Sequence, residues 1–501
     1  MHTCVKKENV FMYKINGREV LWDLFLADKI ENVNLEMHKP VRKGSVLEAD
    51  ELWEGEDTNY LTIIHDGEKY RMYYRGMGTN GGVYKPENGY HVTWCVAYSD
   101  DGKHFYKPNI GKYEFNGSKD NNIVLMDNTR YLDNFAVMYD TNPDCPADEK
   151  YKGLAQYDNP DAPVINGVKF SALLAYYKSA DGINFEYVRN LTVDGAFDSM
   201  NYAFWDESIG KYRLYYRTFH VLDSANKIEY EAEGHVRGVS LATSEDFVNW
   251  EIHGNLDYGD DKLEIQLYTN NVQKYYRGNN FIAIPTRYID RSVDTVNYKY
   301  LPDLNGIRKP LIEREGRGGT AITETMLMTS RDGHSFNRTR EAFLAPGIEC
   351  GDNWVYGDGY FARGMIETAS DFKGEPNELS LYCVRGYRSR GVSIERYTLR
   401  IDGFFSWSAD FNGGEVLTKP FTFDGGKMSV NFATSALGYL HIVFCDENGK
   451  ELSGYDSGRL FGNSIERPVD FEKSLSDLNG KTVRMKISMK DAEFYSFNFE
   501  K

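Results

Sequence analysis

The sequence is poor in cysteine and proline, and it contains no long apolar run and no cluster of positive charge. Its cysteines are too few and too scattered for a disulfide framework, and no Cys-x-x-Cys pair supports a zinc or redox site. No run of about 18 apolar residues occurs, so we expect no membrane-spanning helix. The six cysteines are Cys4, Cys95, Cys145, Cys350, Cys383 and Cys445.

The charge balance is acidic, with a formal net charge of −17 over 501 residues. Without long runs of Lys or Arg, such a chain is a poor partner for nucleic acid or an anionic membrane, and we expect neither. The N-terminal stretch MHTCVKKENVFMYKING shows no apolar segment before a cleavage site. We therefore expect a soluble, cytoplasmic protein, or a secreted or periplasmic one if a leader was removed; the oligomeric state does not follow.

Aromatic residues are abundant, with 37 Tyr and 28 Phe, and Gly reaches 46. This mixture is typical of many short strands and turns, and tyrosine surfaces also stack on sugar rings.

Two units recur along the chain. The first is Ser-x-Asp-Gly-x-x-aromatic, at residues 99–105, 179–185 and 330–336, with a version lacking Gly at 244–250 and a degenerate copy from 400. The second is a strand-turn-strand pattern that precedes each copy, within 59–76, 134–157, 201–218, 270–288 and 360–387. Each repeat therefore reads as a four-stranded meander.

Repeated meanders predict an all-β fold, a five-bladed β-propeller, because a radial arrangement protects exposed strand edges. We expect the propeller at 46–410 and an antiparallel β-sandwich at 412–501, where alternating strands continue without the Ser-x-Asp-Gly unit. Residues 1–45 are expected to pack on the propeller, either as an added strand or as a cover for one face. The Ser-x-Asp-Gly units are expected to be structural turns, in which Asp closes an Asx-turn and Gly takes positive φ.

This plan resembles the five-bladed propeller glycosidases of glycoside hydrolase families 32, 43, 62 and 68, and a propeller followed by a β-sandwich is most similar to family 32. The family 32 motifs Trp-Met-Asn-Asp-Pro-Asn-Gly and Arg-Asp-Pro have no match, and the nearest opening is LWEGEDTNY at 52–60. The resemblance thus implies a divergent, 32-like or 43-like glycosidase, without implying fructosides as substrates.

Acidic residues stand just before the first strand of every expected blade, where the strands converge on the central pocket. Glycoside cleavage needs two carboxyl groups, one protonated and one ionised. We select Glu54, Asp198 and Glu264 as catalytic candidates, and the resemblance, in which the first three blades supply base, modulator and acid, adds Asp133. The remaining acids at these positions are Glu56, Asp57 and Asp358.

Arginines end the second strand of four expected blades, at the rim that carries the acids. They could pair with acids, bind an anionic substrate group, or serve the scaffold, and the three interpretations stay open. Trp53 is expected to form a sugar platform, and amides near the acids to bind hydroxyls. The expected substrate-binding residues are Trp53, Arg75, Asn201, Arg217, Asn270, Arg287, Asp358 and Arg385.

The sequence thus predicts a glycoside hydrolase acting on an oligosaccharide or glycan, without a cofactor. The alternatives are a glycoside phosphorylase, a hydrolase of an anionic glycan such as a uronate or sialoside, and a non-catalytic carbohydrate-binding propeller. No His, Asp or Glu set has the spacing of a metal site. A structural Ca²⁺ stays open, because oxygen ligands need no motif.

Overall fold

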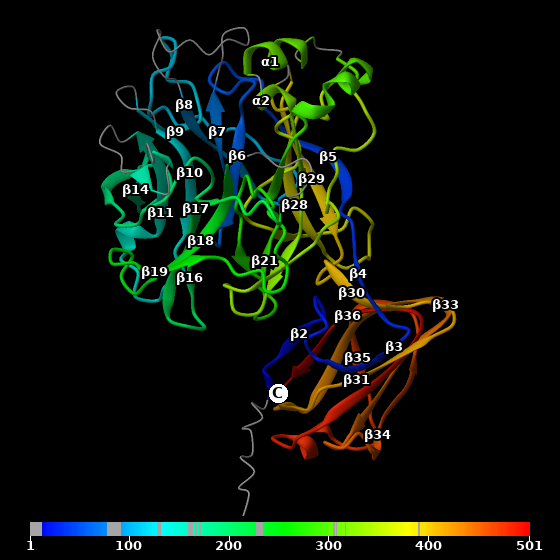
Figure 1. Cartoon of the computed structure of the whole chain (residues 1–501). Coiled ribbons are helices and arrows are strands. Elements are labelled where there is room, and N and C mark those ends of the chain that lie inside the picture. The colour runs from blue at the N-terminus through cyan, green and yellow to red at the C-terminus, as the bar shows by residue number, and fades with distance from the viewer. Residues whose placement is uncertain are drawn as a thin grey trace, which may run out of the picture. The chain divides into compact units, whose positions relative to one another are not determined.

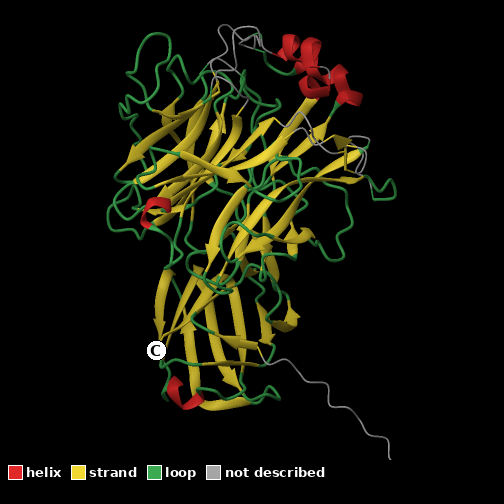
Figure 2. Cartoon of the chain, turned by 90° about the vertical axis from the view of Figure 1, so that its left-hand side faces the viewer, coloured by secondary structure: helices red, strands yellow, loops and turns green. Residues whose placement is uncertain are grey.

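The structure is a computed structural model that describes residues 13–77, 92–127, 132–158, 164–165, 168–169, 172–226, 234–303, 306, 308–315, 317–388 and 391–500. The chain forms two compact units (Figure 1). The propeller unit comprises Lys39–Lys274 and Phe281–Leu399, and the described residues of the terminal unit lie within Met1–His38, Tyr275–Asn280 and Arg400–Lys501. Strands predominate throughout (Figure 2), and no helix among the described residues is long and apolar enough to cross a membrane.

The predicted five-bladed propeller is confirmed. Blade one is β6 (Asn59–His65), β7 (Tyr70–Met77), β8 (Val92–Ser99) and β9 (Ile123–Met126), and blade two is β10 (Leu132–Tyr139), β11 (Tyr151–Asp158), β14 (Ala172–Ser179) and β15 (Glu186–Asn190). Blade three is β16 (Tyr202–Asp206), β17 (Lys211–Val221), β18 (His235–Ser244) and β19 (Glu251–Asn255), and blade four is β20 (Gln273–Lys274), β21 (Phe281–Ala283), β24 (Met328–Ser330) and β25 (Phe336–Arg338). All neighbouring strands within these blades pair antiparallel.

Blade five is closed by a strand from the other end of the chain. It contains β26 (Tyr360–Phe361), β27 (Ile366–Thr368), β28 (Glu378–Arg385) and β29 (Ser393–Leu399), and its outermost strand is β5 (Val41–Glu48). Because β5 supplies this strand, the chain leaves the propeller after β29. The degenerate repeat from residue 400 therefore belongs to the terminal unit and is not a fifth blade turn.

The propeller unit also contains short elements outside the five blade sheets. The hairpin β22 (Thr286–Asp290) and β23 (Ala321–Thr325) extends blade four, and the segment between them holds η3 (Ser292–Tyr300), α1 (Arg308–Glu315) and α2 (Arg317–Thr320). The remaining elements are η2 (Ala147–Glu149), β12 (Val164–Ile165) and β13 (Val168–Lys169).

The three Ser-x-Asp-Gly turns that contain glycine each accept a hydrogen bond from a tyrosine of the preceding blade. In the blade-two copy, the Ser179 hydroxyl and two backbone N–H groups donate to Asp181, and Gly182 adopts φ +73°. The Tyr73 hydroxyl of blade one donates to the Gly182 carbonyl at 2.8 Å. A Cβ added at Gly182 would lie 2.5 Å from that hydroxyl oxygen, so the close approach requires glycine. The turn is structural, as the repeat pattern predicts.

The same fastening recurs around the ring. Tyr215 of blade three donates to the Gly333 carbonyl of the blade-four turn at 2.6 Å, and Tyr382 of blade five donates to Gly102 of blade one. In the blade-three turn Phe247 replaces glycine, yet it keeps a positive φ of 62°.

The terminal unit is built from both ends of the chain. Its elements are β1 (Tyr13–Ile15), β2 (Arg18–Val20), β3 (Ala27–Glu31), β4 (Asn34–Met37), β30 (Phe405–Ala409), β31 (Gly414–Thr418), β32 (Phe421–Phe423), β33 (Lys427–Cys445), β34 (Glu451–Leu460), β35 (Asn463–Val469), η4 (Leu475–Leu478) and β36 (Arg484–Glu500). The long strands β33 and β36 pair along most of their length and, with β2, β3, β4, β30, β31, β34 and β35, form one antiparallel sheet around an apolar core. The two-layered sandwich arrangement stays a prediction.

The expectation that residues 1–45 form one segment on the propeller is wrong for their first part. Strands β1 to β4 pair with β32, β36, β31 and β30 of the terminal unit, and only β5 joins the propeller. The reason is that β2, β3 and β4 each hydrogen-bond to a strand of the terminal sheet, which local sequence patterns do not reveal.

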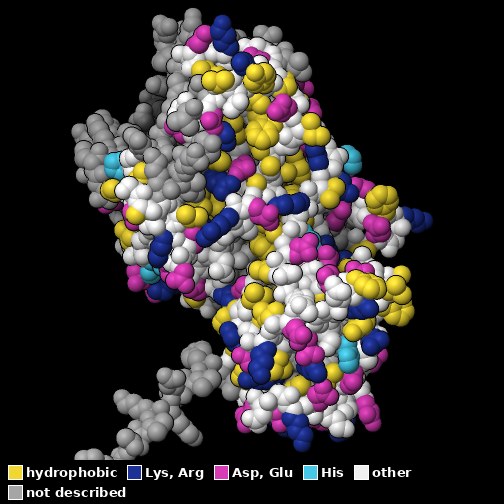
Figure 3. Space-filling model, turned by 45° about the vertical axis from the view of Figure 1, so that its right-hand side comes forward, with side chains coloured by type: hydrophobic (Ala, Val, Ile, Leu, Met, Phe, Trp, Pro, Cys, Tyr) yellow, Lys and Arg dark blue, Asp and Glu magenta, His cyan; other side chains and the backbone are white. Residues whose placement is uncertain are grey.

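Acidic and basic side chains are interspersed over the face shown in Figure 3. On this face, the net negative charge is not concentrated in a single patch.

Candidate active site

Tyrosines from three blades meet where the inner strands begin. The rings of Tyr60 (blade one) and Tyr360 (blade five) stack at 6.3 Å, and Tyr360 and Tyr268 (blade four) stack at 5.8 Å. Tyr356 and Tyr387 pack edge-on against Tyr360 at 6.3 and 5.7 Å. We call these residues, together with Tyr288 beside Tyr268, the tyrosine cluster.

Burial keeps the phenols of this cluster protonated. It raises the pKa of Tyr60, Tyr356 and Tyr360 well above the usual value of a tyrosine. Each hydroxyl therefore remains a neutral group that can donate a hydrogen bond.

Irregular inner strands turn side chains toward this centre. Tyr60 and Asn134 occupy the second residue of blade one's β6 and the third of blade two's β10, with positive φ values of 52° and 55°. At both positions the pairing register shifts, between Asn59 and Thr62 and between Asp133 and Ala136. The bulge re-aims the flanking residues, as irregularities next to active sites commonly do.

Arg75 links blades one, two and five at this centre. Its guanidinium lies 4.6 Å from the ring centre of Tyr60, bonds Asp133 through Nη1 at 2.9 and 3.2 Å, and donates to the Tyr387 hydroxyl at 3.2 Å. Asp133 is buried with it. This pair follows the acid-pairing interpretation of the rim arginines.

Arg217 reaches the same region from blade three but finds a different partner. It donates to the backbone carbonyl of Tyr268 and lies 5.2 Å from the centre of that ring. Among the described residues, no carboxylate lies within ion-pair distance of it. Only 2% of Arg217 is exposed, so its side chain packs against Tyr268 with almost no contact with solvent.

Asp198 is the exposed acid of the site. It stands in a tight turn of blade three in which Phe197 has φ 42°, and the Asn201 amide donates to the carbonyls of Phe197 and Ser199 at 2.8 Å. The Ser199 hydroxyl donates to the Tyr268 carbonyl, which anchors the turn to the cluster.

The Asp198 carboxylate acts electrostatically on two members of the centre. Burial raises the pKa of Tyr60 and lowers the pKa of Arg217, and the negative charge of Asp198 acts upward on both. Within the described chain, no donor bonds its oxygens, and the residue is exposed. Asp198 is thus both near the cluster and accessible to a substrate.

Asp57 and Asp358 complete the set of acids around the cluster. Asp57 pairs with Arg388 at 3.0 Å, and the Arg388 guanidinium lies 5.0 Å from the Tyr356 ring centre. Asp358 stands in the chain between Tyr356 and Tyr360, and its carboxylate accepts from the Val355 N–H at 3.1 Å. Burial raises the pKa of Asp358 to about 7, which distinguishes it from the paired acids.

Glu54 and Trp53, predicted as catalytic acid and sugar platform, lie elsewhere. The Glu54 side chain is fully buried, and its oxygens accept from Tyr74 at 2.6 Å, Lys107 at 2.7 Å and the Glu51 N–H at 3.1 Å. The Trp53 indole donates to Asn122 at 2.7 Å and packs within an apolar core. A carboxylate with three donors and no exposed surface cannot meet a substrate, so we assign both residues to the scaffold.

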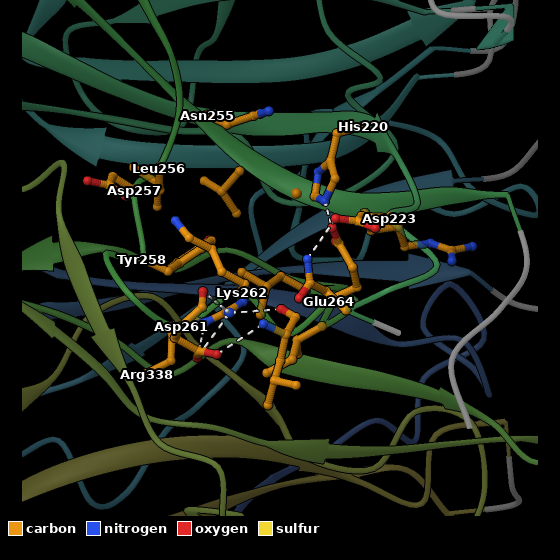
Figure 4. Close-up of a pocket in the computed structure, with 17 residues that line it drawn as sticks. His220, Asp223, Asn255, Leu256, Asp257, Tyr258, Asp261, Lys262, Glu264 and Arg338 are labelled. Carbon is orange, nitrogen blue, oxygen red and sulfur yellow. Dashed lines mark hydrogen bonds and ion pairs between the residues drawn. The ribbon is translucent and has the colours of Figure 1, made fainter. Parts of the chain in front are cut away.

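Glu264 lies in a separate pocket. Figure 4 shows His220 and Glu264 facing each other across it, with His220 Nε2 and Glu264 Oε2 2.8 Å apart. The pocket has a volume of about 370 Å³ and lies between blades three and four. Arg237 lines it and also lies 5.5 Å from the Tyr268 ring centre, so the pocket adjoins the tyrosine cluster.

The other two predicted rim arginines each have an acidic partner of their own. Arg287 pairs with Glu324, and Arg385 pairs with Asp352 at 2.9 Å. Asn270 is buried next to Tyr268 in sequence and accepts from the Val272 N–H. In the part of the chain that the structure describes, no group of three or more His, Cys, Asp or Glu residues could hold a metal ion.

Comparison with known proteins gives only distant structural likenesses. No family model and no curated protein matches the sequence. Among solved structures, an N-acetylgalactosamine deacetylase from F. plautii, in complex with blood group B trisaccharide, shares 11% identity; the match covers 74% of this chain and 96% of that one, with a TM-score of 0.43. A thermostable family-43 glycoside hydrolase shares 11% identity over 70% of this chain and 93% of its own, with a TM-score of 0.39.

A further likeness is to a structure described for the GH130 family of mannoside phosphorylases, which contains glycoside hydrolases that target β-1,2 mannosidic linkages. The identity is 13%, the match covers 72% of this chain and 94% of that one, and the TM-score is 0.37. At this distance, the roles of individual residues rest on the geometry of this chain alone.

Proposed function

We propose that the protein is a carbohydrate-active enzyme that hydrolyses a glycosidic bond at the tyrosine cluster. The observation that carries the proposal is a pair of acids next to residues of one aromatic centre, in opposite electrostatic settings: Asp198, whose turn bonds Tyr268, and Asp358, which stands in the chain between Tyr356 and Tyr360. Asp198 is exposed beside the cluster, whereas burial raises the pKa of Asp358 to about 7. Glycoside cleavage needs such a division between an ionised and a protonated carboxyl group.

In this proposal Asp198 is the base or nucleophile. Its carboxylate is exposed and accessible, and its turn is fixed to the Tyr268 carbonyl through Ser199. Asp358 is the general acid, because a carboxyl group with a pKa near neutrality can donate a proton to the leaving oxygen.

Asp133 has a supporting electrostatic role. Since Arg75 holds it in a buried ion pair, its role is to position Arg75 at the centre and not to contact a substrate. Aromatic rings of the cluster offer surfaces on which a sugar ring can stack.

The test is a screen of chromogenic glycosides and an oligosaccharide panel, with and without phosphate, on the wild type and on Asp198→Asn and Asp358→Asn. Asp144→Asn is the matched control, since Asp144 is an exposed acid of blade two. We expect hydrolysis without phosphate, lost in both site variants and kept in the control. Turnover that requires phosphate would indicate a phosphorylase, and carbohydrate binding without turnover would indicate a binding propeller.

A further inference from the structure

Arg363 lies on the propeller axis. It stands between β26 and β27 of blade five, and its backbone bridges Thr62 of blade one. Its guanidinium lies 5.0 Å from the ring centre of Tyr202 and 5.3 Å from that of Phe204, both in blade three. Blade three is adjacent to neither blade five nor blade one in the ring, so these three blades meet only across the centre.

No acidic side chain balances this cation among the described residues. Two buried arginines of the propeller have carboxylate partners, Arg75 with Asp133 at 2.9 Å and Arg213 with Asp206 at 2.7 Å, whereas the buried Arg217 donates to a backbone carbonyl. An uncompensated charge that is shielded from water is costly for a protein. The positive charge of the Arg363 guanidinium therefore favours a negatively charged ligand beside it.

Hydrogen-bonding capacity is left unused around Arg363. Arg363 Nε is a buried atom with no hydrogen bond within the described structure, and the buried Tyr202 and Thr62 hydroxyls beside it lie close enough to interact with each other. Nearly all buried polar groups in native proteins are satisfied by protein, water or an ion. All three groups can donate a hydrogen bond, which favours an anion and disfavours a metal cation.

We propose that a small inorganic anion, for which chloride is the probe, binds on the propeller axis between Arg363, Tyr202 and Thr62. Thr62 lies two residues beyond Tyr60 on β6, about 7 Å along the strand. The proposed anion site therefore lies farther along β6 than the tyrosine cluster. This proposal does not depend on the proposed hydrolase activity.

The direct test is chloride-35 NMR line broadening, which reports halide bound to the protein. The wild type should broaden the chloride signal, and bromide should compete. Arg363→Met should remove the broadening, whereas the matched control Arg213→Met, which alters a buried arginine that has its own acid, should retain it. Tyr202→Phe keeps the ring beneath the guanidinium but removes one donor, and we expect about tenfold weaker chloride binding.

Two further measurements keep the proposal falsifiable if Arg363→Met does not fold. Anomalous scattering from bromide-soaked crystals of the wild type should give a peak within hydrogen-bond distance of the Arg363 guanidinium. At constant ionic strength, chloride in place of sulfate should raise the melting temperature saturably by about 2 to 4 °C. Wild-type protein that neither broadens the chloride signal nor holds bromide at Arg363 would overturn the proposal.

Discussion

Strands β7 of blade one and β17 of blade three carry nearly the same sequence, YRMYYR and YRLYYR, and differ mainly in what the arginine at the site end contacts. Their first arginines behave alike: Arg71 bonds Asp66 at 2.5 Å and Arg213 bonds Asp206 at 2.7 Å. Their last arginines do not. Arg75 pairs with the buried Asp133, whereas Arg217 donates to a backbone carbonyl.

The difference follows from the neighbouring blade. Blade two begins with Leu132-Asp133 and offers an acid to Arg75, while blade four offers the Tyr268 backbone to Arg217. The shared motif thus forms equivalent second strands in the two blades. Whether its last arginine meets a carboxylate or a backbone carbonyl depends on the residue that the neighbouring blade places beside it. Blade three also carries Asp198 at the same rim, an exposed acid without an ion-pair partner among the described residues.

The largest effect is expected from breaking the ion pair between Arg75 and Asp133. Arg75→Met should lower the free energy of unfolding by about 3 to 5 kcal/mol, because it leaves the Asp133 carboxylate buried without its cation. Arg217→Met should cost clearly less, since no described carboxylate loses a partner. Urea unfolding followed by tryptophan fluorescence compares the two variants, and equal losses would contradict the distinction drawn between them.

The next effect concerns the two acids of this comparison. Asp198→Asn should reduce turnover by about 10³-fold without lowering the melting temperature, because the side chain is exposed and general acid–base groups contribute about 10² to 10⁴-fold. Asp133→Asn should instead lower stability, since Arg75 loses its charge partner. Full activity in Asp198→Asn, with Asp144→Asn as control, would remove Asp198 from the mechanism.

The fold was predictable because its signals are local. Period-2 strands, hairpin turns and the Ser-x-Asp-Gly repeats each lie within a few residues, and together they define the blades. For the closing strand β5 the sequence predicts only one of two alternatives, an added strand or a cover for one face, because its pairing with β29 joins segments about 350 residues apart.

The site was predictable only in part, for the same reason. Asp198, Asp133, Arg75 and Arg217 follow from the ends of strands that converge on one rim. The burial of Glu54 does not, because its partner Lys107 comes from a distant loop. The tyrosine cluster does not follow from the sequence either. The chain has 37 tyrosines, and no local pattern marks the six that pack together.

A smaller effect is expected from the proton on Asp358. Its folded pKa of about 7 lies above that of an unfolded Asp, so the folded protein binds this proton more tightly. The contribution to stability is therefore fully present below about pH 4 and is lost as the pH rises through 7. For the general acid, turnover should fall about tenfold per pH unit above 7, because the reactive form is protonated.

The pH profile of kcat/KM checks this expectation. Asp358→Asn should abolish the alkaline fall and reduce turnover by about 10²-fold. A profile whose alkaline limb is unchanged in Asp358→Asn would assign the general acid to another group, with Asp57, the acid paired with Arg388, as the next candidate.

The smallest effect tests the part that the two strands share. Tyr73→Phe and Tyr215→Phe each remove one hydroxyl that donates to the glycine carbonyl of the next blade's turn, at 2.8 and 2.6 Å. Each variant should lose about 1 to 1.5 kcal/mol of stability, the value of one buried hydrogen bond, with turnover unchanged. Both tyrosines are buried, so unequal losses, measured by urea unfolding, would show that the blades are not fastened equivalently.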